Sequence, residues 1–275
     1  MTKAKMKQPI CNLLTIAGSD PSGGAGIQAD LKAFSACGCY GMSVITGLTA
    51  QNTQGVQAIH PLPADFVAQQ FDSLLADIRI DAIKIGMLSD VRIIDVIADR
   101  LADFNGPIVL DPVMIAKGGA ALIDSPTQLA LRDRLLPLAG LVTPNLPELA
   151  TLVAQDEATT PEQMLSQAQQ LLDLGAQAVL AKGGHLPGDH CQDLLLSTEQ
   201  ALWFSHPRLA THNTHGTGCT LSSAIASFWA QTGDLAQAIQ QAKDYINAAI
   251  AHADQLTVGS GHGPTHHFHA WWSIQ

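Results

Sequence analysis

The sequence has few of the features that mark membrane, secreted or nucleic-acid-binding proteins. None of its apolar runs approaches the roughly 18 residues that a membrane span needs. Its five cysteines are an odd and scattered set, which argues against the disulfide framework of a secreted protein. Basic residues number only 14 against 24 acidic ones, and a net charge of −10 disfavours contact with a phosphate backbone. We therefore expect a soluble, cytoplasmic protein without nucleic-acid or membrane partners.

Charged residues are also scarce, at 14%, whereas 47% of the residues are hydrophobic, which is not the composition of a disordered chain. The chain has no long polar linker, internal repeat or low-complexity tract. At 275 residues it can bury a large core, and we expect one domain over residues 1–275, with residues 1–10 flexible. The lysines of Met1–Lys7 suit a signal peptide, but Ile10–Ala17 contains polar residues and leads into a glycine-rich loop, which favours a first buried strand.

Short apolar runs alternate with longer helical patterns along most of the chain. The runs with the pattern of buried strands are Asn12–Ala17, Ser43–Thr49, Ala82–Ile85, Ile108–Leu110, Leu141–Thr143 and Val179–Lys182. The helical patterns between them include Pro63–Ile78, Val91–Phe104, Pro126–Leu135 and Pro161–Leu174. Thr160 precedes the last of these as a cap, with a proline at the first helical position. This alternation predicts an α/β fold with a mainly parallel central sheet and helices on both faces.

The pattern changes after the last of these strands. Two short apolar runs, Leu194–Ser197 and Ala201–Ser205, flank three polar residues and predict a small hairpin at one edge of the sheet. Two helices should follow, Cys219–Gln231 and Leu235–Ala253, and Asp234 is the expected N-cap of the second. Ligands of such sheets bind beyond the carboxyl ends of the strands, so the residues that follow each strand are the candidates for function.

A glycine-rich loop, residues 18–26, follows the first strand and allows a ligand to approach the backbone closely. Within it, Gly24–Ala29 matches the G-x-G-x-x-A fingerprint of dinucleotide-binding folds. No acidic residue ends a strand about 20 residues later, and no G-x-x-x-x-G-K-[ST] loop occurs anywhere, so both the Rossmann and the P-loop interpretations are disfavoured. A tight loop without a ligand remains an alternative.

Polar residues follow the second strand at Gln51, Asn52 and Thr53. The carboxamide of Gln51 can bind the edge of a polar heterocycle because it offers a donor and an acceptor side by side. A turn with internally satisfied hydrogen bonds explains the same residues equally well.

Two further strand ends carry groups suited to phosphate or metal. Asn145 and Glu148 lie three residues apart at the start of a helix and are suited to hold Mg²⁺ directly or through its waters. Helix capping, with Glu148 favoured by the N-terminal dipole, is the alternative. Lys182 ends a strand before two glycines, where a lysine can contact a phosphate or simply precede a turn.

The strongest signal is the segment Asn213–Thr220, which lies immediately before an apolar helical run. It contains the turn Gly216, Thr217 and Gly218. Such a turn presents backbone N–H groups and the positive end of the helix dipole to an anion. Cys219 lies in the first helical turn, where the same field should favour the thiolate and make it a candidate base or nucleophile. The alternative for this cysteine is a small buried hydrophobic residue.

Two other clusters are weaker candidates. Cys37-Gly38-Cys39 lacks the two-residue spacer of redox and zinc pairs. The histidine-rich tail, residues 262–269, contains metal-ligand types, but its glycine, proline and nearby Trp271 and Trp272 favour a packed, hydrogen-bonded tail.

Six segments, in order, resemble the bacterial hydroxymethylpyrimidine/phosphomethylpyrimidine kinases of thiamine biosynthesis. These segments are Thr15–Asp30, Thr49–Thr53, Lys84–Leu88, Thr143–Glu148, Lys182–His185 and Thr214–Thr220. The tail from Gly263 to Trp272 is similar too, so the resemblance covers almost the whole chain. It implies a ribokinase-like fold and two successive phosphoryl transfers from Mg-ATP, first to 4-amino-5-hydroxymethyl-2-methylpyrimidine and then to its monophosphate. It also implies a homodimer.

The resemblance implies a role for each candidate residue on the substrate side. Gln51 would bind the aminopyrimidine edge, and Gly18, Ala25 and Met87 would line the ring pocket.

On the phosphate side, Asn145 and Glu148 would hold Mg²⁺ and its waters, with Asn145 also beside the nucleotide, and Lys182 would meet the phosphates of ATP. The turn Gly216–Gly218 would form the anion hole. Cys219 occupies the position at which many ribokinase-like sugar kinases have an aspartate base.

Two alternatives to this function remain. A pyridoxal or pyridoxine kinase of the same fold also acts on a ring with a hydroxymethyl group, although Gln51 and Cys219 favour the pyrimidine. A non-catalytic protein that binds a vitamin precursor is disfavoured, because it needs neither the metal residue Glu148 nor the phosphate residue Lys182.

Overall fold

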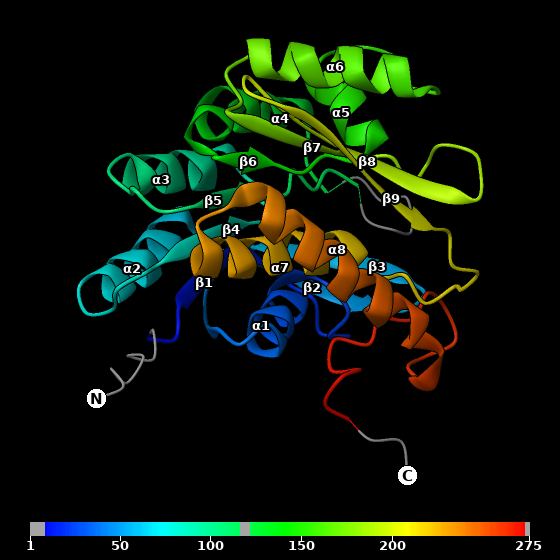
Figure 1. Cartoon of the computed structure of the whole chain (residues 1–275). Helices are drawn as coiled ribbons and strands as arrows, with labels where there is room; N and C mark the ends of the chain where they lie inside the picture. The colour runs from blue at the N-terminus through cyan, green and yellow to red at the C-terminus, as the bar shows by residue number, and fades with distance from the viewer. Residues whose placement is uncertain (1–8, 116–121, 273–275) are drawn as a thin grey trace, which may run out of the picture.

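The computed structural model of the protein describes residues 9–115 and 122–272 (Figure 1). Residues 1–8 lie outside this part of the chain. The disfavoured signal peptide at Met1–Lys7 and the flexibility expected there are therefore not tested.

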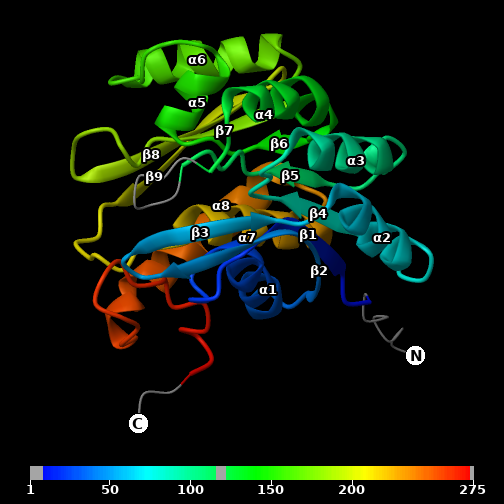
Figure 2. The same ribbon diagram turned by 180° about the vertical axis from the view of Figure 1, so that it is seen from behind.

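Within the described residues, the centre of the molecule is a nine-stranded sheet in the order β3-β2-β1-β4-β5-β6-β7-β8-β9 (Figures 1 and 2). Its strands are β1 (Asn12–Ser19), β2 (Tyr40–Asn52), β3 (Gly55–Pro61), β4 (Ala82–Ile85), β5 (Ile108–Leu110), β6 (Leu141–Val142), β7 (Ala178–Lys182), β8 (His190–Ser197) and β9 (Ala201–Pro207). The strands from β2 to β7 in this order pair in parallel, whereas β3, β8 and β9 are antiparallel to their neighbours. The predicted mainly parallel sheet is confirmed.

Helices cover both faces of the sheet, as Figures 1 and 2 show from opposite sides. They are α1 (Gly26–Ala36), α2 (Ala64–Leu75), α3 (Val91–Leu101), α4 (Ser125–Ala130), α5 (Leu146–Leu152), α6 (Pro161–Asp173), α7 (Thr217–Thr232) and α8 (Leu235–Ala251). Neighbouring strand residues point to opposite faces, so Leu14 packs in a core with α2, α3, α5 and α6, whereas Leu13 packs in a second core with α1, α7 and α8. Among the described helices, none has the length and apolar character required to cross a lipid bilayer.

Local signals set several helix ends. The side chain of Thr160 accepts a hydrogen bond from the Gln163 N–H at 3.3 Å, and that of Asp234 accepts one from Gln237 at 3.0 Å, so both predicted caps are confirmed. The helix expected over Pro126–Leu135 differs in detail. It consists of α4, a π-helical turn at Leu131–Leu135 and a 3₁₀ turn at Leu136–Leu138, where a proline prevents a regular continuation.

Each edge of the sheet carries an antiparallel hairpin. The predicted one is confirmed as β8 and β9, but the pairing of β2 with β3 was not predicted. The apolar pattern of β2 stops near Thr49, and for this reason the strand was expected to end there. Pairing with β3 extends β2 to Asn52, and Gln51 lies opposite Val56. The expectation that Gln51 follows the strand is therefore wrong, because it lies inside the hairpin.

Candidate active site

A pocket of about 580 Å³ lies beyond the carboxyl ends of the parallel strands. Every site residue predicted from the sequence lines it, namely Gly18, Ala25, Gln51, Met87, Asn145, Glu148, Lys182, Gly216, Thr217, Gly218 and Cys219. Parallel strands bring their carboxyl ends to one edge of the sheet, and this explains why residues from so many segments meet.

The loop after β1 forms an apolar wall of the pocket. Asp20 holds this loop in place, because its Oδ1 accepts a hydrogen bond from the Ser22 N–H at 2.9 Å and its Oδ2 accepts one from the Ala25 N–H at 2.9 Å. The loop thereby presents Ala25 to the pocket, whereas Gly18 lies near the end of β1. The side chain of Met87 packs directly against Gly18.

Gln51 places a polar group beside this wall. Its Oε1 lies 3.2 Å from Thr49 Oγ1, and its Nε2 lies 3.3 Å from His215 Nε2. Thr49 in turn donates to the Ser19 carbonyl at 3.0 Å. The carboxamide is therefore held on two sides, and it still lines the pocket.

The turn at Gly216 also lines the pocket, directly against the first loop. Gly216 has a φ of +77°, and a Cβ there would lie 1.7 Å from the Gly24 carbonyl oxygen, so this position requires glycine. Helix α7 begins at this turn without a side-chain cap. Its first N–H, that of Thr217, bonds to the Thr214 carbonyl at 3.3 Å, so the following N–H groups and the positive dipole end are available to an anion. Thr217 turns its hydroxyl away, because Oγ1 donates to the Thr214 carbonyl at 2.8 Å.

Cys219 follows this turn and lines the pocket, but its ionisation differs from the prediction. Burial raises the pKa of the thiol to about 11, although Lys84 and a hydrogen bond from the Gly26 N–H favour the thiolate. Asp30 and Asp111 oppose the negative charge as well. The expectation that the helix start lowers this pKa is therefore wrong for the protein without ligands, because burial and nearby carboxylates outweigh the helix.

A fully buried ion pair lies behind Cys219. Lys84 Nζ lies 3.0 Å from both oxygens of Asp30, which also accepts hydrogen bonds from Thr15 at 2.6 Å and Ser223 at 2.7 Å. Burial disfavours the ammonium, but the Asp30 carboxylate outweighs it and raises the pKa of Lys84. No role was predicted for this pair, although a lysine inside an apolar strand was the signal that could have revealed it.

Lys182 and Asp111 meet in the same pocket. Lys182 Nζ donates to Asp111 Oδ1 at 3.0 Å, and Thr143 Oγ1 donates to the same oxygen at 3.2 Å. A Cβ at Gly218 would lie 3.2 Å from Lys182 Nζ, so the lysine reaches the start of α7. Asp111 was missed in the sequence, although it directly follows the predicted strand Ile108–Leu110.

Asn145 and Glu148 form a capping box at the start of α5. The Asn145 N–H donates to Glu148 Oε2 at 2.8 Å, and the Glu148 N–H donates to Asn145 Oδ1 at 2.9 Å. The capping alternative is therefore observed, and it does not exclude a second role. Burial raises the pKa of Glu148 to about 7, with Lys182 acting against this shift and Asp111 adding to it.

These residues have the donor types that Mg²⁺ prefers. Asp111 and Glu148 offer carboxylates and Asn145 offers a carbonyl, all lining the same pocket. No group of three or more His, Cys, Asp or Glu side chains placed to hold a metal occurs among the described residues. Such a donor set fits Mg²⁺, which typically binds one or two carboxylates and completes its shell with water and substrate phosphates.

A buried pair supports the segment after β7. The Gly183 N–H donates to Asp193 Oδ1 at 3.0 Å, and Lys243 Nζ donates to Asp193 Oδ2 at 2.6 Å. Strand β8 and helix α8 thereby fix the backbone next to Lys182.

Comparison with known proteins places the chain in a family. A model of the phosphomethylpyrimidine kinase family matches residues 20–266. The hydroxymethylpyrimidine/phosphomethylpyrimidine kinase of Escherichia coli (strain K12) is 52% identical over 262 residues, which are 95% of this chain and 98% of that protein. The chain belongs to the phosphomethylpyrimidine kinase family. The resemblance inferred from the six segments is confirmed.

Two other relatives extend this result. The thiamine biosynthesis bifunctional protein ThiED of Geobacter sulfurreducens is 49% identical over 260 residues, which are 94% of this chain and 52% of that longer protein. The ADP complex of Bacillus subtilis pyridoxal kinase superimposes with a TM-score of 0.88 at 37% identity, covering 95% of this chain and 99% of that one. The chain is thus a kinase with the fold of these enzymes, and the ribokinase-like fold expected from the resemblance is confirmed.

The histidine-rich tail of this family member packs against the body of the protein. His266 and His267 are buried, His267 Nε2 lies 2.9 Å from Thr220 Oγ1, and Tyr245 donates to the His267 carbonyl at 2.9 Å. Burial lowers the pKa of His267 to about 3. The predicted hydrogen-bonded tail is observed, although the aromatic ring of Trp272 that contacts His266 stays largely exposed.

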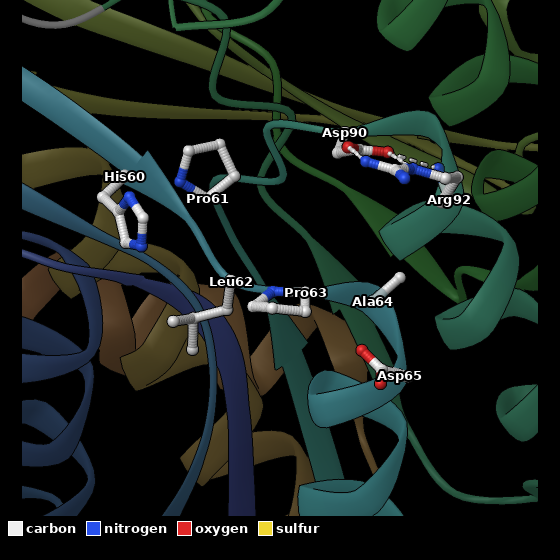
Figure 3. Close-up of a pocket in the computed structure, with 8 residues that line it drawn as sticks. All are labelled: His60, Pro61, Leu62, Pro63, Ala64, Asp65, Asp90 and Arg92. Carbon is white, nitrogen blue, oxygen red and sulfur yellow. Dashed lines mark hydrogen bonds and ion pairs between the residues drawn. The ribbon is translucent and has the colours of Figure 1, made fainter.

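A second hollow of about 610 Å³ lies away from the predicted site residues (Figure 3). It is lined by His60, Pro61, Leu62, Pro63, Ala64, Asp65, Asp90 and Arg92. Its main charged groups neutralise one another, because Asp90 caps α3 and binds the Arg92 guanidinium at 2.6 Å. The residues that line this hollow include no lysine and no cysteine, unlike those of the first pocket.

Proposed function

We propose that this kinase phosphorylates 4-amino-5-hydroxymethyl-2-methylpyrimidine to its monophosphate and then to the diphosphate, with Mg-ATP as donor, in thiamine biosynthesis. The E. coli relative is named for both steps, and the G. sulfurreducens relative is named for thiamine biosynthesis. The observation that carries the proposal is that one pocket contains both the carboxamide of Gln51 and the uncapped start of α7.

The ring binds on the side of Gln51. A carboxamide offers one donor and one acceptor side by side, which complements an amino group next to a ring nitrogen. The surfaces of Gly18, Ala25 and Met87 contact the faces of the ring, since all three line this part of the pocket. This arrangement directs the hydroxymethyl group toward the start of α7.

The phosphates bind between Lys182 and the turn Gly216–Gly218. Phosphoryl transfer depends mainly on positioning and on neutralising the negative charge that spreads over the phosphoryl oxygens. The ammonium of Lys182 and the available N–H groups at the start of α7 supply part of that neutralisation. Asn145, Glu148 and Asp111 would hold Mg²⁺, which when bound neutralises further charge on the phosphates.

Cys219 takes the proton of the hydroxymethyl group. The hydroxyl becomes strongly acidic only as its oxygen bonds to phosphorus, so a late proton acceptor suffices. A thiol with a pKa of about 11 is mostly protonated near neutral pH. Only the thiolate, which Lys84 favours from behind the pocket, accepts the proton. The hydroxyl proton passes to the thiolate sulfur as the oxygen–phosphorus bond forms and the bond from the phosphoryl group to ADP breaks.

Pyridoxal is the second candidate substrate. The B. subtilis neighbour, which has a TM-score of 0.88 to this protein, is described as a pyridoxal kinase. A pocket of the same fold therefore accepts a different ring with a hydroxymethyl group. The pyrimidine remains the first choice because the E. coli relative, which is 52% identical to this chain, is named for it.

Turnover of ATP with three separate acceptors tests the proposal. The purified protein is incubated with Mg-ATP and the pyrimidine, its monophosphate or pyridoxal, and ADP release is followed together with the phosphorylated product. We expect turnover with the pyrimidine and its monophosphate, and a kcat/KM for pyridoxal well below that for the pyrimidine. Turnover of pyridoxal alone would assign the protein to the second function, and binding without turnover would support a non-catalytic role.

The cytoplasmic location, expected from the composition, and the homodimer stay predictions. Light scattering during gel filtration measures the mass in solution, and 58 kDa would be roughly the mass of a dimer, twice the 29.0 kDa of one chain. Fractionation of cells that express the chain tests its location.

A further inference from the structure

His215 lies between the first loop and the Gln51 strand, and no role was assigned to it from the sequence. Its Nε2 lies 2.8 Å from Asp20 Oδ2 and 3.3 Å from Gln51 Nε2. All three residues line the pocket. They come from β2, from the loop after β1 and from the segment before α7, so this contact exists only in the folded protein.

The position of the His215 ring is tightly defined. Its backbone N–H donates to the Gly263 carbonyl at 2.9 Å. A Cβ at Gly24 would lie 2.4 Å from Cδ2 of the ring, so the imidazole packs on the bare backbone of Gly24. Only 11% of the side chain is exposed, which leaves little freedom for the ring to turn away from Asp20.

The hydrogen bonds of Asp20 decide where the His215 proton lies. Burial alone raises the pKa of Asp20, but hydrogen bonds from His215 and Ser22 outweigh it and lower the pKa, so the side chain is a carboxylate. A carboxylate only accepts hydrogen bonds. The Nε2 atom that faces it at 2.8 Å must therefore carry the hydrogen.

The proton on Nε2 has a consequence for Gln51. An N–H group has no lone pair, so it cannot accept a hydrogen bond from the Gln51 amide nitrogen. Turning the carboxamide by 180° exchanges its oxygen and nitrogen, which differ little in shape. The oxygen is then the second, longer acceptor of a bifurcated hydrogen bond from the Nε2–H, at 3.3 Å beside Asp20 at 2.8 Å. The nitrogen donates to Thr49 Oγ1, and the Thr49 hydrogen still goes to the Ser19 carbonyl, 3.0 Å away. Every hydrogen in this chain of contacts then has an acceptor.

We propose that His215 is a positioning residue that determines the specificity for the ring. Asp20 holds the proton of His215 on Nε2, and this proton turns the Gln51 oxygen toward His215 and the Gln51 nitrogen toward Thr49. One lone pair of the Gln51 oxygen and one N–H of its nitrogen then remain for the ring of the substrate. The acceptor lies on the His215 side and the donor lies on the Thr49 side. That order selects a heterocycle with an amino group beside a ring nitrogen over a ring that lacks this pair. The inference rests on the proposed function, in which Gln51 binds the ring edge.

Two substitutions of similar size test this role. His215→Gln keeps an N–H donor near the position of Nε2, whereas His215→Met removes it. We expect His215→Met to raise the KM for the pyrimidine by roughly 5- to 150-fold, the range for an unpaired buried polar group, and to leave the KM for ATP within threefold. His215→Gln should recover most of the lost affinity, and the exposed His60→Met serves as a control for the chemistry of the substitution.

The ratio of substrates distinguishes positioning from a general structural effect. His215→Met should lower kcat/KM for the pyrimidine at least tenfold more than kcat/KM for pyridoxal, and a ¹⁵N spectrum of the unaltered protein should show the proton of His215 on Nε2. Equal losses for both rings, equal behaviour of the glutamine and methionine variants, or a proton on Nδ1 would overturn the inference. Failure of the proposed function is distinct, since the unaltered protein would then not turn over the pyrimidine.

Discussion

Lys84 and Asp30 form an ion pair that lies wholly inside the protein, with Lys84 Nζ 3.0 Å from both carboxylate oxygens. The pair joins β4 to α1, and Ser223 of α7 donates to Asp30 at 2.7 Å. Ser223 lies one helical turn after Cys219, on the same side of α7. The pair therefore links the core to the part of the pocket that contains Cys219.

Replacing Lys84 by methionine should both destabilise the protein and alter Cys219. An unpaired buried carboxylate costs about 3–5 kcal/mol in the free energy of unfolding, which urea denaturation measures. Because Lys84 favours the thiolate, its loss should also slow alkylation of Cys219 at pH 8. Adding Asp30→Leu should restore part of the stability and also part of the alkylation rate, because Asp30 disfavours the thiolate. An unchanged rate in Lys84→Met would show that the ammonium does not act on the thiol.

Removing the carboxamide of Gln51 should affect ring binding alone. Gln51→Leu leaves the polar edge of the pyrimidine unpaired, which costs roughly 1–3 kcal/mol. We expect the KM for the pyrimidine to rise accordingly, with the KM for ATP and the slow hydrolysis of ATP without acceptor nearly unchanged. An unaltered KM for the pyrimidine would remove Gln51 from the ring site.

The two roles of Glu148 are separable by substitution. Glu148→Gln keeps an oxygen that accepts from the Asn145 N–H, so stability should change little, but the loss of charge should lower kcat and raise the Mg²⁺ concentration required. Asn145→Thr keeps a capping oxygen, whereas Asn145→Ala loses the cap and about 1 kcal/mol of stability. A Mg²⁺ titration beside a melting curve measures both effects, and an unchanged Mg²⁺ requirement in Glu148→Gln would leave only the capping role.

The Mg²⁺ requirement should also depend on pH. Burial raises the pKa of Glu148 to about 7, so the group that would bind the metal is increasingly protonated below that pH. The Mg²⁺ concentration for half-maximal rate should therefore fall as pH rises from 6 to 8. This dependence should be lost in Glu148→Gln, and its persistence there would assign it to another group.

Cys219 should matter for turnover and not for nucleotide binding. Cys219→Ala should lower kcat by roughly 10²- to 10⁴-fold, the usual effect of removing a general base. ADP binding, measured by calorimetry, should persist because the anion site is made of backbone. Cys219→Asp should retain more activity than Cys219→Ala, since a carboxylate can also accept the proton. Near-normal turnover by the alanine variant would leave Cys219 as part of the pocket wall only.

The buried tail should make stability depend on pH. Burial lowers the pKa of His267 to about 3, below the value of about 6.5 in an unfolded chain. Between these values only the unfolded chain binds the proton, so the stability contributed by neutral His267 is lost progressively as pH falls from about 6.5. At pH 5 the loss in the free energy of unfolding is about 2 kcal/mol. Urea denaturation at a series of pH values measures this loss, and it should be absent in His267→Gln. The exposed His60→Gln should leave the pH dependence unchanged, and an equal slope in His267→Gln and the unaltered protein would contradict the assignment.

The sequence by itself determined much of the framework. Alternating apolar runs and helical patterns predicted the mainly parallel sheet, because burial on both faces requires continuous apolar strands. The caps Thr160 and Asp234 and the hairpin β8–β9 were also predictable, since each depends on residues within a few positions of one another. The candidate site residues could be found for a related reason, because residues after parallel strands must gather at one edge of the sheet.

Only the tertiary structure decided how these groups act. Asp20 and His215 are 195 residues apart, and Asp111 and Lys182 are 71 apart, so no local pattern indicates that they meet. The hairpin that places Gln51 inside β2 depends on pairing with β3, and the pKa of Cys219 depends on burial and on charges from other elements. Hydrogen bonding between distant segments and the removal of water from a side chain are properties of the packed protein, and a linear pattern of residue types does not contain them.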